Sequence, residues 1–90
     1  MRVAIAGTVE TRGGRPSFAA LADGTEGLIE LDNSAAAKLA GRAVGDARIG
    51  AINGARAMIE DAATRLHQTG CATQAADGRW LLLLSALDLD

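Results

Sequence analysis

Three glycine-containing dipeptides constrain the fold of this chain more than any other feature of its sequence. Gly13-Gly14, Asp23-Gly24 and Asp77-Gly78 each separate two segments that are rich in apolar residues. Two-residue connections of this composition favour tight turns between antiparallel strands, because both central residues of such turns need positive φ angles. The dipeptides therefore predict strands at both ends of the chain, over residues 3–11, 15–22, 25–31, 71–76 and 79–87.

The order of side chains within these segments predicts how the strands are buried. In residues 3–9, Val3, Ile5 and Val9 alternate with small residues, which predicts a strand with one buried face. Residues 80–84 are apolar at every position and predict a central strand buried on both sides. A helix is the alternative for this run, since leucine favours helices, but its short length and the preceding Asp-Gly turn favour a strand.

The middle of the chain is predicted to form two helices. Asp32, Asn33 and Ser34 offer N-cap oxygens before an alanine-rich segment, and Gly41 is placed to end that helix. A longer helix is predicted over residues 46–70. Its buried stripe consists of apolar positions three or four residues apart: Ile49, Ile52, Ala55, Ile59, Ala62 and Leu66.

Two glycines weaken the longer helix. Gly50 and Gly54 each cost about 1 kcal/mol relative to alanine. Either the first turns of this helix fray, or a neighbouring backbone approaches closely there. We expect Trp80 to be buried against the same helix, near Ile59.

Strands at the ends with helices between them indicate an α+β fold with a mainly antiparallel sheet. A β-meander is followed by two helices and a closing β-hairpin, and the long helix packs on one sheet face. A chain of 90 residues suits a single domain, 1–90. No apolar run approaches the length of about 20 residues that spans a bilayer, and the N-terminus lacks the apolar stretch of a signal peptide. We therefore expect a cytoplasmic protein without membrane contact.

No pattern in the sequence predicts a cofactor. Residues 2–7 resemble the opening strand of a dinucleotide-binding fold, but the glycines that follow fit neither common phosphate-binding motif. No helix pattern begins at Gly7, so no helix N-terminus is available to hold a phosphate. The single cysteine also excludes an internal disulfide.

The residue types that carry catalysis or bind metals are few. His67 and Cys71 are four residues apart, but a metal site needs further ligands and a nucleophile–base pair needs an orienting group. We interpret them as a surface histidine near a helix C-terminus and a small buried cysteine. Two carboxylate pairs are interpreted as solvated: Glu26 and Glu30 beside Leu28 at a sheet edge, and Asp88 and Asp90 in a fraying tail. We predict no catalytic residue, no metal and no enzymatic activity.

The favoured function is therefore a non-enzymatic protein-interaction or regulatory module with an unknown protein partner. Its predicted interaction surface contains Arg12, Arg15, Arg56 and Glu60. The alternative is a weak nucleic-acid-binding domain in which Arg2, Arg12 and Arg15 cluster near the first turn. The net charge of −2 and the scarcity of aromatic residues argue against nucleic acid.

Self-association is the most specific of these expectations. Free strand edges invite pairing unless they are blocked, and Pro16 is the only proline available to block one. Alanine makes up a large part of the 49% of residues that are apolar, so large apolar side chains are scarce for a monomer. We predict a homodimer, formed through a sheet edge or through the exposed side of the helix that contains Gly50 and Gly54.

A series of short motifs resembles a bacterial family of small uncharacterised proteins, domain of unknown function 1488. The matching residues, between positions 15 and 87, are Phe18, Asp23-Gly24, Ile29, Ala37, Leu39, Ala51-Ile52, Arg56, Ile59-Glu60, Ala63, Gly70, Asp77-Gly78-Arg79 and Leu87. The resemblance implies a β-meander, two helices and a return to the sheet. Family members often carry Asn-Arg where this chain has Ala55-Arg56, so no role of that asparagine is implied here. The family has no assigned activity.

Overall fold

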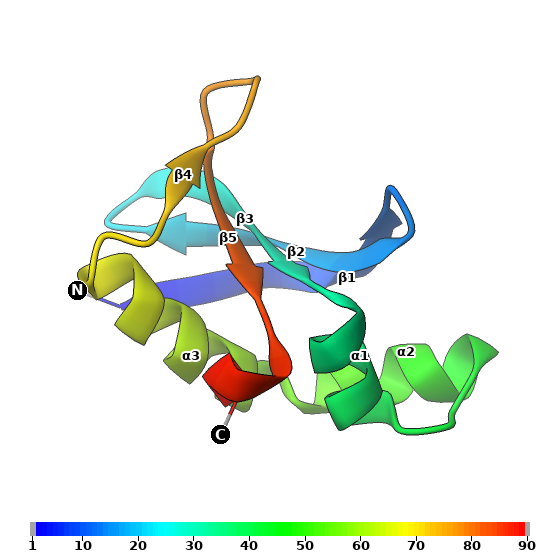
Figure 1. The fold of residues 1–90 in the computed structure, drawn as a ribbon. Coiled ribbons are helices and arrows are strands. Elements are labelled where there is room, and N and C mark those ends of the chain that lie inside the picture. Colours follow the sequence, from blue (N-terminus) through cyan, green and yellow to red (C-terminus); the bar gives the residue numbers. More distant parts are fainter. Residues whose placement is uncertain (1, 90) are drawn as a thin grey trace.

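A computed structural model describes residues 2–89 and has the α+β fold that the sequence predicts (Figure 1). The strands are β1 (Val3–Arg12), β2 (Arg15–Ala22), β3 (Thr25–Leu31), β4 (Thr73–Gln74) and β5 (Trp80–Leu84). The helices are α1 (Asn33–Ala40), α2 (Gly45–Gly54) and α3 (Arg56–Gln68), and a short 3₁₀ helix, η1 (Ala86–Leu89), follows the last strand.

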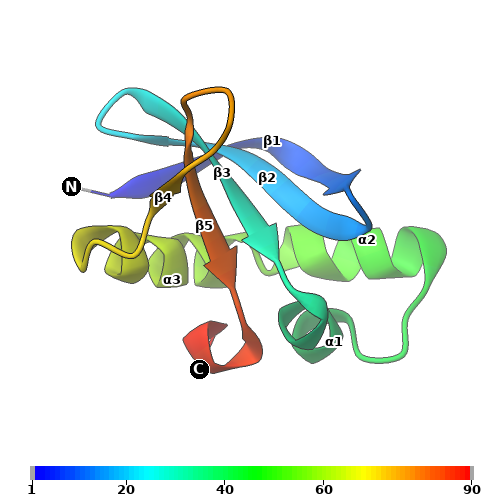
Figure 2. The same cartoon turned by 45° about the horizontal axis from the view of Figure 1, so that its top comes forward.

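The strands form one sheet in the order β1-β2-β3-β5-β4. All neighbouring strands are antiparallel except β3 and β5, which run parallel. The chain between these two strands contains all three α-helices, and they lie on the same side of the sheet (Figure 2). The molecule thus has two layers, and one face of the sheet is covered by none of the helices in residues 2–89.

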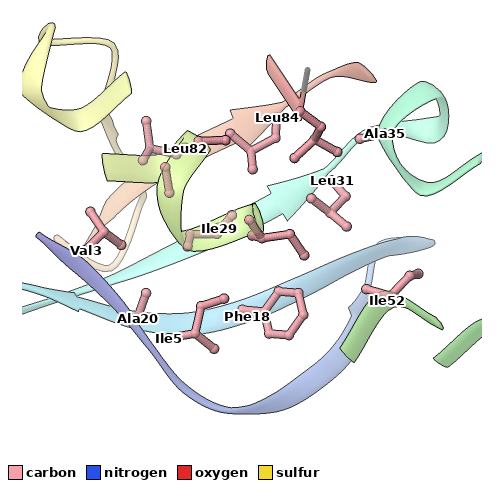
Figure 3. Close-up of a cluster of buried hydrophobic side chains, with 14 of the residues drawn as sticks. Val3, Ile5, Phe18, Ala20, Ile29, Leu31, Ala35, Ile52, Leu82 and Leu84 are labelled. Carbon is pink, nitrogen blue, oxygen red and sulfur yellow. The ribbon is translucent and has the colours of Figure 1, made fainter. Parts of the chain in front are cut away.

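The hydrophobic core fills the space between the sheet and the helices. Phe18, Ile29 and Leu82 of three strands share this cluster with Ile52 of the helical layer (Figure 3). These four side chains and Ile59 of α3, which belongs to the same cluster, are at most 1% exposed. The alternation predicted for β1 is confirmed at its start, because Val3 and Ile5 are buried and the residue between them is exposed. It does not continue to Val9, which is half-buried, because the register shifts between Ala6 and Glu10. Apolar side chains at every second position of the strands therefore build the covered face.

Trp80 is buried as predicted, with 8% of its surface exposed. Its indole Nε1 donates a hydrogen bond of 2.9 Å to the carbonyl oxygen of Thr25. On α3, the ring of His67 meets the indole edge-on at a centroid distance of 5.2 Å, and Ile59 belongs to the same buried cluster as Trp80. Gly27 lies directly against the indole, since a Cβ atom at this position would be 2.0 Å from ring carbons of Trp80.

The closing strand differs from the prediction in two ways. Burial on both sides is wrong, because Leu82 and Leu84 are buried but Leu83 is 48% exposed. The physical reason is that all three α-helices cover the same face. The strand also ends at Leu84 and does not continue to residue 87. The carboxylate of Asp88 accepts hydrogen bonds from the backbone N–H and the hydroxyl of Ser85, which closes a turn. Asp88 is therefore engaged and not solvated; Asp90 lies outside the described residues.

The single long helix predicted over residues 46–70 is wrong, because α2 and α3 are separate helices that meet at Ala55. Ile49, which the apolar stripe predicts to be buried, is 46% exposed. A Cβ atom at Gly50 or Gly54 would meet nothing within 4 Å, so no neighbouring backbone in residues 2–89 approaches these glycines. Their low helix propensity is consistent with a break at this point.

Helix α1 begins and ends where the sequence predicts. The carboxylate of Asp32 accepts hydrogen bonds from the hydroxyl of Ser34 (2.6 Å) and the backbone N–H of Ala35 (2.9 Å). Both hydrogen bonds favour the charged form of Asp32, so its pKa is lowered from its ordinary value. The bond from Ser34 makes the largest contribution to this shift. At the other end, the N–H of Gly41 donates to the carbonyl of Ala37.

Candidate functional site

The outer edge of β1 is hydrogen-bonded by side chains of the helical layer. The backbone N–H of Ile5 donates to the Glu60 carboxylate (2.7 Å), and the N–H of Val9 donates to the side-chain oxygen of Asn53 (2.9 Å). Nearer the start of the strand, the hydroxyl of Thr64 accepts a hydrogen bond from the backbone N–H of Val3 (3.0 Å). A second strand added at this edge would have to displace these side chains.

Arg56 holds the irregular part of the same strand. The register between β1 and β2 shifts between Ala6 and Glu10, so β1 carries extra residues there and bulges. The guanidinium of Arg56 donates to the carbonyl oxygens of Ile5 (2.5 Å) and Gly7 (3.2 Å). Two residues of the predicted interaction surface, Arg56 and Glu60, thus bind the backbone of this chain's own edge strand.

The opposite edge of the sheet is short. β4 pairs with β5 only at Trp80 and Leu81, so no strand in residues 2–89 pairs with the outer side of the last three residues of β5. This open stretch ends at Ser85, whose N–H is already bonded to Asp88. Edge pairing, one of the two predicted routes to a homodimer, has little free backbone on either side.

None of the described helices covers the second face of the sheet, which we call the open face. It is crossed by rows of side chains in register. The central row consists of Ala6, Ala19, Leu28 and Leu81, each the direct partner of the next on neighbouring strands. On one side of it, Leu21 pairs with Glu26; on the other side lies the row Glu10, Ser17, Glu30 and Leu83. The open face is therefore apolar along its middle.

The position of Glu26 and Glu30 corrects one expectation. They lie on either side of Leu28 as predicted, but β3 is an inner strand between β2 and β5, not a sheet edge. Leu28 is only 6% exposed, because neighbouring side chains of the open face surround it. Leu21 and Leu83 are more exposed than Leu28, with 40% and 48% of their surfaces accessible to solvent.

A hollow of about 210 Å³ lies on the open face between the central row and the row of Leu21 and Glu26. It extends from β1 across β2 and β3 to the residue before β5, and it is lined by Ala6, Ala19, Ala20, Leu21, Glu26, Gly27 and Arg79. Two further hollows lie along α3 and η1 and meet at Arg65, whose guanidinium donates to the carbonyl oxygen of Asp88 (2.9 Å).

Charges of both signs border the open face. Arg15 forms an ion pair with Glu30 at 3.7 Å, and Arg79 bonds the carboxylate of Asp77, whose pKa is lowered chiefly by that hydrogen bond. On the β1–β2 hairpin, Arg12 of β1 lies directly opposite Arg15 of β2. Three arginines (12, 15 and 79) thus stand against three glutamates (10, 26 and 30) and Asp77, so the face carries no excess of positive charge.

The predicted cluster of Arg2, Arg12 and Arg15 is not formed. Arg2 precedes β1 at the opposite end of the strand from Arg12. It is bound to Asp61 of α3 at 2.6 Å, and this hydrogen bond raises the pKa of Arg2. The arrangement that the nucleic-acid alternative requires is therefore absent from the described residues.

His67 and Cys71 differ in exposure and in what they contact. Cys71 is exposed, so the expectation of a buried cysteine is wrong; its Sγ lies 3.3 Å from the hydroxyl of Thr69. The Nδ1 of His67 is buried beneath Trp80 without a hydrogen-bond partner in the described part of the chain. Over the same residues, no group of three or more His, Cys, Asp or Glu side chains is placed to hold a metal. None of the described helices is both long enough and apolar enough to cross a membrane.

Comparison with known proteins yields no relative: no protein-family model, curated protein or solved structure matches the chain. The resemblance to domain of unknown function 1488 rests on the sequence motifs alone. The open face and the hollow within it are the features from which a function has to be argued.

Proposed function

We propose that the protein is a non-enzymatic interaction module that forms a homodimer through the open face of its sheet. The observation that carries the proposal is an apolar central row on a face that none of the described helices covers. Antiparallel sheets that face water usually present polar residues there. Here Leu21 and Leu83 beside the central row are 40% and 48% exposed, and burying them against a second copy removes apolar surface from water.

The size of the face suits such a contact. A stable interface of standard size buries about 800 Å² on each partner, which the short free edge beyond Leu81 does not provide. The open face is larger than this edge, because four neighbouring strands contribute side chains to it.

The balance of charge favours a second copy over a strongly charged partner. An equal number of arginines and glutamates on the face gives no long-range attraction for nucleic acid. Arg15 already has Glu30 as a partner, and Arg2 has Asp61. The nucleic-acid alternative therefore has less support than a second copy of this chain.

Size-exclusion chromatography with light scattering tests the proposal. We expect a mass of twice 9.2 kDa at high micromolar concentration, falling toward 9.2 kDa on dilution. Leu83→Lys should give the monomer at every concentration, because it replaces an exposed leucine of the open face by a charged side chain. A wild-type chain that stays at the monomer mass would overturn the proposal.

A matched variant separates the open face from the helical route. Ile49 of α2 is 46% exposed, nearly as much as Leu83 at 48%, but it lies in the helical layer. Ile49→Lys should leave the dimer intact. If Ile49→Lys dissociates the dimer and Leu83→Lys does not, the contact is formed by α2 and the open face is not the site.

A further inference from the structure

Strand β1 lies at one edge of the sheet, and no strand in residues 2–89 pairs with its outer side. Three backbone N–H groups and two carbonyl groups on that side are instead bonded by side chains of α2 and α3. These backbone groups belong to every second residue of the strand: Val3, Ile5, Gly7 and Val9. This alternation is the pattern of one side of a strand, so the helical side chains occupy the positions at which a further strand would bond.

The spacing of these side chains along the helices matches the spacing of the strand. Their order runs opposite to that of β1, since Thr64 bonds the start of the strand and Asn53 bonds its far part. Arg56, Glu60 and Thr64 are four residues apart on one face of α3, and α2 contributes Asn53. Four residues of helix advance about 6 Å and two residues of antiparallel strand about 6.8 Å, so each helical turn meets the next outward position of β1. We call these four side chains the edge cover.

The sequence of β1 lacks the residues that usually prevent pairing at a sheet edge. Residues 3–9 contain no charged side chain and no proline, and four of the seven are valine, isoleucine or threonine. Uncharged windows of this composition pair readily with other chains when they are exposed. The bulge between Ala6 and Glu10 is an obstacle within the strand, and Arg56 bonds carbonyl groups beside it. The protection of this edge therefore depends on α2 and α3.

We infer that the outer edge of β1 is a latent self-association surface, which the edge cover keeps closed. Without the edge cover, the outward backbone groups of β1 lose their partners, and unpaired N–H and C=O groups favour pairing with another strand. The strand that fits is β1 of a second copy, because one edge then supplies donors and acceptors to both chains about a two-fold axis. This surface is separate from the open face, and the inference does not depend on the proposed dimer.

The double variant Arg56→Ala/Glu60→Ala tests the inference. It removes three of the five hydrogen bonds to the edge and one charge of each sign, so the net charge is unchanged. We expect light scattering to give about twice the wild-type mass or more at high micromolar concentration, since edge pairing joins further copies. Circular dichroism checks that the variant folds. A folded double variant that keeps the wild-type mass would contradict the inference.

The background Leu83→Lys separates this inference from the proposed function. We expect Arg56→Ala/Glu60→Ala to raise the mass in that background as well, because the open face takes no part in pairing at β1. If the mass rises only where Leu83 is retained, the association uses the open face and the edge of β1 is not the surface.

The matched control is Arg2→Ala/Asp61→Ala. This ion pair also links the start of β1 to α3, and its removal takes away one charge of each sign, but the bond lies between two side chains. The backbone groups of the edge keep their partners, so we expect the wild-type mass. If the control associates as strongly as Arg56→Ala/Glu60→Ala, loosening α3 from β1 is sufficient and the edge cover has no specific role.

A lysine in β1 shows whether the association uses this strand. Thr8 is exposed and lies within the uncharged residues 3–9, and lysine on an edge strand opposes pairing. Adding Thr8→Lys to Arg56→Ala/Glu60→Ala should therefore remove the larger species. If that species persists, the chains associate through another surface and the inference is wrong.

Glu60→Ala alone repeats the test if the double variant does not fold. It leaves the N–H of Ile5 without its acceptor, whereas Glu60→Gln keeps an oxygen that can accept this bond. We expect association of the alanine variant and the wild-type mass for the glutamine variant. Equal masses for the two variants would count against the edge cover.

Discussion

Along β5, the two faces of the sheet differ in what covers them and not in the class of residue they contain. Strand β5 shows this within five residues, because Trp80, Leu82 and Leu84 are buried while Leu83 between them is 48% exposed. All of these side chains are apolar, so hydropathy assigns them to one class. Burial depends on the side of the sheet to which the helices return. The comparison teaches that a fully apolar strand need not be covered on both sides within one chain.

We expect the largest loss of stability from a substitution on the covered face of the sheet. Trp80→Ala removes a buried indole that packs on Gly27 and bonds Thr25, and such truncations cost about 3–5 kcal/mol. That is a large part of the stability of a domain of this size. Urea unfolding followed by circular dichroism measures it. If the unfolding midpoint is unchanged, the indole does not anchor β5.

The next effect tests the close approach of Gly27 to the same ring. Gly27→Ala places a methyl group 2.0 Å from ring carbons of Trp80, and overpacking of this kind costs about 1–3 kcal/mol. In the Trp80→Ala background the added methyl has no ring to meet, so its cost should largely disappear. A double-mutant cycle measured by urea unfolding gives the coupling. Additive effects would show that the two residues are not in contact.

Acid should weaken the end of the sheet where α1 begins. The folded-state pKa of Asp32 is below its ordinary value of 3.8, so this carboxylate stabilises the fold above that pH. The contribution is lost as the pH falls through the lower, folded-state pKa. The variant Asp32→Asn keeps a capping oxygen at this position but has no carboxylate to titrate. We expect the Tm of this variant to fall less steeply than that of wild type below about pH 4; equal slopes would exclude Asp32 as a source of the acid sensitivity.

We expect a smaller change, an increase in stability, from a substitution in the helical layer. Gly50 lies inside α2, and a Cβ atom there would meet nothing within 4 Å. Gly50→Ala should therefore stabilise the protein by about 0.5–1 kcal/mol, because alanine loses less backbone entropy in a helix. Thermal unfolding measures this shift. The reverse sign would mean that α2 packs more tightly than the structure indicates.

Local patterns are sufficient to predict much of the fold. The Gly-Gly and Asp-Gly dipeptides do separate strands, and Asp32 and Gly41 do bound α1. Each of these features depends on residues close together in the sequence. The break at Ala55 escapes prediction because the apolar spacing continues through it, although Gly50 and Gly54 signal that the helix is weak there.

The features that define the candidate site depend on distant residues. Asn53, Arg56 and Glu60 bond to a strand more than 40 positions away, as between Val9 and Asn53. Arg56 and Glu60 are four residues apart on one face of α3, and Asn53 lies near the end of α2, but nothing in the sequence identifies these positions as the cover of a strand edge. The open face escapes prediction for the same reason, since it depends on which side of the sheet the helices pack.

We expect the smallest change in monomer stability from a substitution on the open face. Leu83→Thr replaces a half-exposed leucine on an open strand by a residue that favours strands, so the stability of the dilute monomer should change by less than about 0.5 kcal/mol. In the proposed dimer the same side chain is buried. The Tm of wild type should then rise with protein concentration, and that of Leu83→Thr should rise less, because association stabilises only the folded chain. Thermal unfolding over a wide range of protein concentrations measures both quantities. A large loss in the dilute monomer would mean that Leu83 is already packed within one chain, and the two faces would then differ less than their burial indicates.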